Sequence, residues 1–255
     1  MADLLVTTDG PVATVTVNRP ALRNSVTLAM WSGFVDIFAR LGADPAVRAI
    51  ILTGAGADFS SGADIGEFAA VRDDLDQSKA YEVAVDAGCA AIAHVAKPVI
   101  AVCRGYTLGG GAHLAMSADF RFAAPDTKFG IPAARLSIVY GEQATRKLLA
   151  LVGLTEAKRI LFSAERFDAA RALEIGFVDD VSDDPLAAAH AFAAHLAGLA
   201  PLTQAGAKFI LNSAAFGDLD EGRVDAVIDA ASASEDYAEG RRAFAEKRAP
   251  RFVGA

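Results

Sequence analysis

The first half of the chain carries short apolar runs that predict β-strands. Residues 4–8 and 12–17 alternate between apolar and polar side chains, which is the pattern of half-buried strands. Residues 49–53 and 99–103 are almost continuously apolar, as expected for strands that are buried on both faces of a parallel sheet. The strands expected from these patterns are residues 4–8, 12–17, 49–53, 99–103, 120–123 and 177–181.

Helical spacing replaces the strand pattern over most of the second half. An early helix is expected from a cap at Ser25 or Thr27 to about Leu41, because its apolar side chains recur every three or four residues. A polar helical stretch is expected over residues 65–95, and a later helix is expected to stop at Gly153. Mostly helical segments then continue to about Lys247. Strands followed by helices predict one continuous α/β domain.

Composition and charge narrow the class of protein. The chain has 255 residues, 53% of them hydrophobic, and a net charge of -8 without any block of Lys or Arg. A nucleic acid or an anionic membrane surface is therefore not an expected partner. Cys89 and Cys103 are expected as buried free thiols in a reducing compartment. With no apolar run near the about 18 residues of a membrane span, a cytoplasmic protein is expected.

Two turns rich in small residues follow two of the apolar runs. Gly109-Gly110-Gly111 comes after residues 99–103 and is expected to open a short helix. Ser60-Ser61-Gly62-Ala63-Asp64 comes after residues 49–53. Glycines leave backbone N–H groups bare, and a helix N-terminus adds the positive end of its dipole. Close packing of a helix on a strand also uses such glycines. The joint presence of both turns favours two N–H donors that converge on one oxygen.

Other motifs are excluded by single residues. Gly54-Ala55-Gly56 begins like a dinucleotide-binding fingerprint, but Phe59 stands where the third glycine is needed. The run at Gly109 lacks the Lys-Ser/Thr pair of a phosphate-binding P-loop. The histidines and carboxylates show no metal-ligand spacing, so no metal site is expected.

The two turns belong to a set of motifs that runs along the chain. In order, the motifs are Asn18-Arg19-Pro20 with Asn24, Phe59-Ser60-Ser61-Gly62-Ala63-Asp64, Lys97-Pro98-Val99-Ile100-Ala101, Gly105-Tyr106-Thr107-Leu108-Gly109-Gly110-Gly111, Asp119, Phe129-Gly130 and Ala243-Phe244-Ala245-Glu246-Lys247-Arg248. Taken together and over nearly the whole chain, this set resembles the crotonase superfamily, the enoyl-CoA hydratase/isomerase family.

The resemblance implies a fold, a ligand and an assembly. It implies an α/β fold, a crotonase-type spiral of ββα units over residues 1–195, with a helical C-terminal trimerisation region over residues 196–255. It implies an acyl-CoA thioester as ligand, no cofactor beyond its coenzyme A moiety, and a homotrimer or hexamer. The residues expected to bind coenzyme A are Arg19, Arg23, Ser61, Asp64, Ile65, Lys247 and Phe252, with Arg251 as a further basic candidate.

The resemblance also implies the chemistry and shows where this chain departs from it. The N–H groups of Ala63 and Gly110 are expected to hold the thioester carbonyl oxygen and to stabilise an enolate. Hydratases of this family carry two glutamates at positions that here hold His113 and Ala133. Alanine cannot transfer a proton, so hydration by the usual pair of glutamates is not expected.

Three residues remain as candidates for the polar chemistry: His113, Tyr140 and Glu142. Each also has an ordinary structural explanation: a hydrogen-bonded helix residue, a packed tyrosine and a helix N-terminal acid. A lyase or isomerase of the family is therefore expected. One alternative is a malonyl-type acyl-CoA decarboxylase that uses Tyr140, because a decarboxylase branch of the family carries a tyrosine at this position. The other alternative is a non-catalytic acyl-CoA binding protein.

Overall fold

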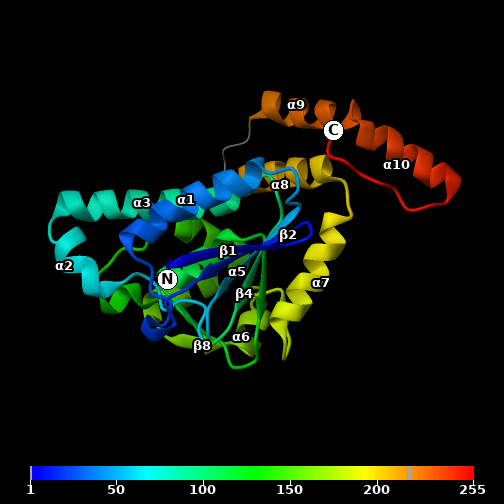
Figure 1. Cartoon of the computed structure of the whole chain (residues 1–255). Coiled ribbons are helices and arrows are strands. Elements are labelled where there is room, and N and C mark those ends of the chain that lie inside the picture. Colours follow the sequence, from blue (N-terminus) through cyan, green and yellow to red (C-terminus); the bar gives the residue numbers. More distant parts are fainter. Residues whose placement is uncertain (1, 217–219) are drawn as a thin grey trace.

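The computed structural model describes residues 2–216 and 220–255, which form two β-sheets covered by helices (Figure 1). The strands are β1 (Leu4–Asp9), β2 (Val12–Val17), β3 (Ala49–Gly54), β4 (Val99–Cys103), β5 (Tyr106–Leu108), β6 (Phe120–Ala123), β7 (Lys128–Gly130), β8 (Arg166–Asp168) and β9 (Asp180–Val181). The larger sheet has the order β1-β2-β3-β4-β6-β9, and only β1 and β2 are antiparallel neighbours in it. The smaller sheet has the order β5-β7-β8.

The helices complete a spiral around these sheets. They are η1 (Pro20–Leu22), α1 (Leu28–Ala43), η2 (Ile65–Glu67), α2 (Phe68–Val71), α3 (Leu75–His94), α4 (Gly110–Ser117), η3 (Pro132–Arg135), α5 (Glu142–Ser163), α6 (Ala169–Glu174), α7 (Pro185–Ala197), α8 (Pro201–Phe216), α9 (Glu221–Ser232) and α10 (Glu235–Glu246). β4 enters the larger sheet, β5 enters the smaller one and α4 follows; β6 and β7 repeat this order. This repetition confirms the expected spiral of ββα units.

The elements expected from the sequence are present, with differences at short strands. Each expected strand exists, although the last one contracts to β9. Helix α1 begins after Thr27, whose side-chain oxygen accepts a hydrogen bond from the Met30 N–H. Gly153 takes a φ of 73° inside α5 and breaks it, as expected for a glycine that ends a helix. The strands β5, β7 and β8 were not expected, because three residues are too few for a periodic pattern to be visible.

The core explains why the central strands are apolar at every position. Ile50 and Leu52 of β3 point into the larger apolar cluster, which includes α1 and α3 side chains. Ile51 of β3 belongs to a second cluster with Ala189 and Ala193 of α7, on the other face of the sheet. A strand covered on both faces buries each of its side chains, and β3 is buried throughout. The expected buried thiols, Cys89 and Cys103, are free and buried.

The C-terminal helices extend beyond this core. In Figure 1, α9 and α10 project away from the two sheets, while α7 runs along the larger one. Helix α9 contains no buried residue, and Phe244 on α10 is 87% exposed. The trimerisation role of this region stays a prediction. No single helix of the described residues is long and apolar enough to cross a membrane; α7 and the part of α8 that ends at Ala215 reach that limit only as a pair bent by 110°.

The packing of α1 on α3 leads to a first prediction. A Cβ at Gly88 of α3 would lie 2.7 Å from the Trp31 carbonyl oxygen of α1, which is too close for a real contact. Gly88→Ala is therefore expected to lower the free energy of unfolding by about 1–3 kcal/mol through overpacking. The midpoint of thermal unfolding, followed by circular dichroism, should fall by about 2–4 °C per kcal/mol.

The control is Gly206→Ala in α8, where the added Cβ would lie 3.8 Å from Val227 in ordinary contact. Because alanine favours helix more than glycine does, this variant should match or exceed the wild-type midpoint. A Gly88→Ala midpoint equal to that of Gly206→Ala would contradict the close approach of the two helices.

Candidate active site

The two turns singled out in the sequence meet at the junction of the sheets. Ser60 forms an isolated parallel bridge with Thr107 of β5, and Ala63 forms another with Val26 before α1. Gly62 has a φ of 101°, and a Cβ there would lie 2.7 Å from the Leu108 carbonyl oxygen and 3.0 Å from the Gly110 nitrogen. Only glycine permits this backbone and this approach, so the turn at Gly62 sets Ala63 beside the start of α4.

This arrangement leaves two backbone donors without a protein acceptor. In the bridge of Ala63, Val26 donates to the Gly62 carbonyl and accepts from the Asp64 N–H, so the N–H of Ala63 itself is not used. Gly110 is the first residue of α4, and its N–H has no acceptor within the helix. Within the described part of the chain, neither N–H donates to a protein atom. The Ala63 nitrogen lies 3.3 Å from where a Cβ of Gly110 would stand.

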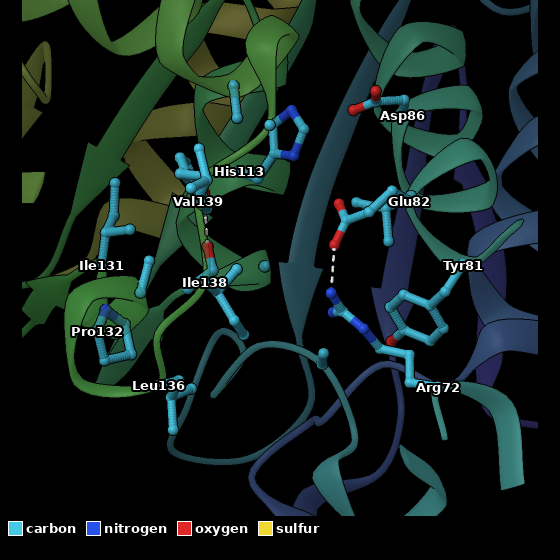
Figure 2. Close-up of a pocket in the computed structure, with 18 of the residues that line it drawn as sticks. Arg72, Tyr81, Glu82, Asp86, His113, Ile131, Pro132, Leu136, Ile138 and Val139 are labelled. Carbon is cyan, nitrogen blue, oxygen red and sulfur yellow. Dashed lines mark hydrogen bonds and ion pairs between the residues drawn. The ribbon is translucent and has the colours of Figure 1, made fainter. Parts of the chain in front are cut away.

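A largely apolar cavity lies next to these two donors. Ala63 and Gly110 line it together with His113, Ala133 and Tyr140, and its volume is about 120 Å³. Cavities of about 150 Å³ hold one benzene-sized molecule, so this one offers room for a small acyl group. Apolar walls are supplied by Trp31, Phe68, Val85, Ile131, Leu136 and Ile138. The residues that carry the predicted donors therefore line a space with room for a ligand. Figure 2 shows this cavity.

His113 lies deep in this cavity and is held neutral. Its side chain is 3% exposed, and its Nε2 atom is buried without a hydrogen-bond partner. Burial, and then the nearby charge of Lys147, lowers the pKa of His113 well below 6.5. Lys147 donates to the Ser117 Oγ over 2.9 Å, and Ser117 donates to the His113 carbonyl oxygen over 2.7 Å. Nε2 is thus the free polar atom that α4 offers to a ligand.

Tyr140 lines the cavity, whereas Glu142 does not. The Tyr140 hydroxyl donates to the Gly109 carbonyl oxygen over 3.0 Å, and its ring centre lies 6.0 Å from that of His113. Burial raises the pKa of Tyr140 well above 10. Glu142 is the first residue of α5, its side chain is 79% exposed, and it pairs with Arg146 one turn later. The structure brings together His113 and Tyr140 but leaves Glu142 outside the cavity.

Two acidic residues of the cavity were not among the expected ones. Glu82 and Asp86 lie one turn apart on α3 and line the wall opposite His113, as Figure 2 shows. Arg72 pairs with Glu82 over 2.8 Å. The available signal was their spacing beside the apolar positions Tyr81 and Val85, which places all four on the inner part of the helix. Nothing in the sequence showed which face of α3 meets the glycine run.

The expected coenzyme A residues near the N-terminus support the turn that carries Ala63. The Arg19 guanidinium pairs with Asp64 over 2.7 Å, and this hydrogen bond lowers the pKa of Asp64 below 3.8. Ser61 donates from its N–H to the Arg23 carbonyl oxygen over 2.9 Å. Ile65 is 65% exposed and lines the cavity. Arg19 is thus engaged inside the protein, while the exposed Arg23 guanidinium stacks over the Tyr106 ring.

The expected C-terminal residues lie elsewhere. Lys247 ends α10, and the Phe252 ring packs near Gly240 of the same helix. The Arg251 N–H donates to Glu239. In Figure 1, α10 lies at the opposite end of the molecule from α2 and the adjoining end of α3, which border the cavity. This chain therefore does not bring Lys247 and Phe252 to its own cavity.

Comparisons with known proteins agree with this fold. A family model described as enoyl-CoA hydratase/isomerase matches residues 7–255. The "probable enoyl-CoA hydratase" echA8 of Mycobacterium tuberculosis is 35% identical over 254 residues, covering 98% of this chain and 97% of that protein. The 2,3-dehydroadipyl-CoA hydratase of Escherichia coli is 31% identical over 258 residues, covering all of both chains.

A solved structure extends the agreement to three dimensions. The enoyl-CoA hydratase/carnithine racemase of Magnetospirillum magneticum superposes with a TM-score of 0.93 at 33% identity, covering 100% of this chain and 97% of that one. The protein therefore has the crotonase fold of enzymes that act on acyl-CoA thioesters. It belongs to the enoyl-CoA hydratase/isomerase family.

The burial of His113 leads to a prediction about pH. The unfolded chain takes up a proton at this residue near pH 6.5, whereas the folded chain does so only at a lower pH. Between these two pKa values the unfolded state binds one more proton, so the free energy of unfolding should fall by about 1.4 kcal/mol per pH unit as the pH decreases. Urea unfolding of the wild type and of His113→Gln from pH 7 to pH 5 measures this slope.

The expected result is a shallower pH slope in His113→Gln than in the wild type. The matched control is His195→Gln, which changes an exposed histidine of α7 and should retain the wild-type slope. Equal slopes in the wild type and in His113→Gln would show that His113 takes up its proton equally well in the folded state.

Proposed function

We propose that this protein forms an enolate from an acyl-CoA thioester whose carbonyl oxygen is bound by the N–H groups of Ala63 and Gly110. The observation that supports this is the pair of unused backbone donors at the wall of a cavity. Backbone donors aimed at a developing oxyanion stabilise the transition state, and they need no rearrangement as the charge forms. The dipole of α4 adds to this stabilisation because Gly110 begins the helix.

The reaction that fits this site best is isomerisation of an enoyl thioester. Hydration by the usual mechanism uses two carboxylates to position and split a water molecule, and positions 113 and 133 hold His113 and Ala133. Moving a double bond requires one proton to leave one carbon and one to arrive at another, so one acid–base group suffices. The enolate is the intermediate between these two steps, and the oxyanion hole stabilises it in both directions.

Decarboxylation of a malonyl-type thioester is the second candidate. Two observations favour it: Tyr140 lines the cavity, and loss of carbon dioxide needs no base to form the enolate. The carboxylates of Glu82 and Asp86 weigh against it, because they would repel an anionic substrate group in an apolar cavity. A non-catalytic acyl-CoA binding protein is the third candidate, since the cavity lacks both usual glutamates.

We further propose that coenzyme A is bound partly across a subunit interface of a homotrimer or hexamer. Ser61 and Ile65 flank Ala63 in sequence, whereas Lys247 ends α10 and Phe252 packs near Gly240 of that helix. Figure 1 shows α10 at the opposite end of the molecule from α2. These C-terminal residues are therefore assigned to the site of a neighbouring subunit. The exposed α9, which buries no residue in this chain, supplies a surface for such an assembly.

Gly110→Ala tests the oxyanion hole directly. The new Cβ would lie 3.3 Å from the Ala63 nitrogen and 3.1 Å from the Trp31 ring, in the space where the carbonyl oxygen is expected. We expect kcat for conversion of a 3-enoyl-CoA to the conjugated 2-enoyl-CoA, followed by absorbance, to fall by about 10²–10³-fold. Gly206→Ala makes the same chemical change away from the cavity and should retain full activity.

The same assay separates the candidate functions. Release of carbon dioxide from malonyl-type thioesters, without isomerisation, would select the decarboxylase. Tight calorimetric binding of acyl-CoA without turnover of any enoyl or malonyl substrate would select the binding protein. Wild-type activity in Gly110→Ala, with an unchanged fold by circular dichroism, would overturn the oxyanion role of this glycine.

A further inference from the structure

The wall of the cavity that faces His113 is built by helix α3 and carries two carboxylates. Figure 2 shows the side chains of Glu82 and Asp86 directed from α3 toward the cavity, with His113 on the facing side. No motif of the family resemblance includes either residue. Their helix is fixed against α1 by the contact of Gly88 with Trp31, so the carboxylates stand on a rigid element rather than on a loop.

The two carboxylates differ in their partners. Glu82 forms an ion pair with Arg72 over 2.8 Å, and the Glu82 side chain is 41% exposed. For Asp86, the described part of the chain shows neither a hydrogen bond nor an ion pair at the carboxylate. A Cβ at Gly141, the residue before α5, would lie 3.8 Å from Asp86 Oδ1. Asp86 is therefore the free carboxylate of the cavity.

The surroundings of Asp86 favour its protonated form more than water does. Loss of solvent raises the pKa of Asp86 above 3.8; the charge of Lys147 opposes this shift, and that of Glu142 adds to it. A carboxyl group whose pKa moves toward neutrality accepts and returns a proton more easily at neutral pH. A carboxylate that is partly removed from solvent and has no ion-pair partner costs folding free energy, so stabilisation of the fold does not explain Asp86.

We propose, on the basis of the proposed function, that Asp86 is the catalytic residue that transfers the proton during isomerisation. Its carboxylate removes a proton from the α-carbon of a 3-enoyl thioester, and the electron pair of that C–H bond forms the enolate at the carbonyl oxygen held by Ala63 and Gly110. The enolate then collapses, the γ-carbon takes the proton back from the Asp86 carboxyl group, and the double bond lies between the α- and β-carbons. One proton leaves and one returns, so no other reactant is consumed.

The other polar groups of the cavity are less suited to this step. The Tyr140 hydroxyl proton is engaged with the Gly109 carbonyl oxygen, and burial holds the pKa of Tyr140 well above 10. Burial, and then the nearby positive charge of Lys147, lowers the pKa of His113 and so disfavours a proton on it. We assign His113 Nε2 to a hydrogen bond with the bound substrate, which would satisfy that orphaned atom.

Exchange of substrate protons with D₂O tests Asp86 separately from complete turnover. Wild type, Asp86→Asn, Asp86→Glu, Glu82→Gln and Gly110→Ala are each incubated with a 3-enoyl-CoA. Deuterium incorporation and double-bond position are followed by NMR, and acyl-CoA affinity is measured by calorimetry. Asp76→Asn is the matched control, because it makes the same change at an exposed position of α3.

The expected result is a loss of exchange and of kcat by at least about 10²-fold in Asp86→Asn, with affinity retained within a few-fold. Asp86→Glu should recover part of the rate because it restores the carboxyl group, and Asp76→Asn should match the wild type. Glu82→Gln should lose less activity than Asp86→Asn, because Arg72 already occupies that carboxylate.

The outcomes distinguish the two proposals. Exchange in Asp86→Asn at the wild-type rate, together with its loss in Gly110→Ala, would overturn the role of Asp86 and leave the enolate chemistry standing. A greater loss of activity in Glu82→Gln than in Asp86→Asn would show that Glu82, not Asp86, transfers the proton. That result would also overturn the proposed role of Asp86. Because Asp86 can return the same proton to the γ-carbon before it exchanges with D₂O, isomerisation without deuterium uptake is compatible with this mechanism. Absence of both exchange and isomerisation in the wild type would overturn the proposed enolate chemistry and the role of Asp86 with it.

Discussion

The close approach of two backbone turns is the constraint on which the site depends. Gly62 tolerates the Leu108 carbonyl oxygen at a distance that no side chain would allow, and this contact sets Ala63 beside Gly110. The ion pair between Arg19 and Asp64 holds the same turn from the other side. Because both donors are main-chain groups, their position follows from the fold itself, and the identity of the surrounding side chains can vary without moving them.

A second constraint is the low polarity of the cavity. An apolar enclosure strengthens electrostatic interactions and penalises every charge that lacks a partner. His113 meets this constraint by staying neutral, and Glu82 meets it through Arg72. Asp86 meets it only through its raised pKa and the more distant charge of Lys147. An acidic group with so little compensation is a feature that function explains better than stability does.

Much of the fold and the two turns that line the cavity could be predicted from the sequence, for physical reasons. The strands at 49–53 and 99–103 are visible because burial on both faces leaves no polar position, and Ala63 and Gly110 are visible because their turns need small residues. β5, β7 and β8 are too short to show a period. Glu142 was a candidate because it is an acid one residue from a position where a branch of the family carries an aspartate. It is a solvent-exposed acid at a helix N-terminus, paired with Arg146. Asp86 could not be predicted as a cavity residue, because the sequence does not show which face of α3 packs toward the glycine run.

The relation between backbone and side chains in this site accounts for both the resemblance to the family and the departure from it. An oxyanion hole made of N–H groups is compatible with any reaction that passes through a thioester enolate, so the hole that we propose at Ala63 and Gly110 points to the intermediate rather than to the reaction. The reaction is chosen by whichever side chain can reach the neighbouring carbons. With His113 neutral and Ala133 inert, we propose that this choice moves from the elements after β5 and β7 to helix α3, which borders the same cavity from the opposite side.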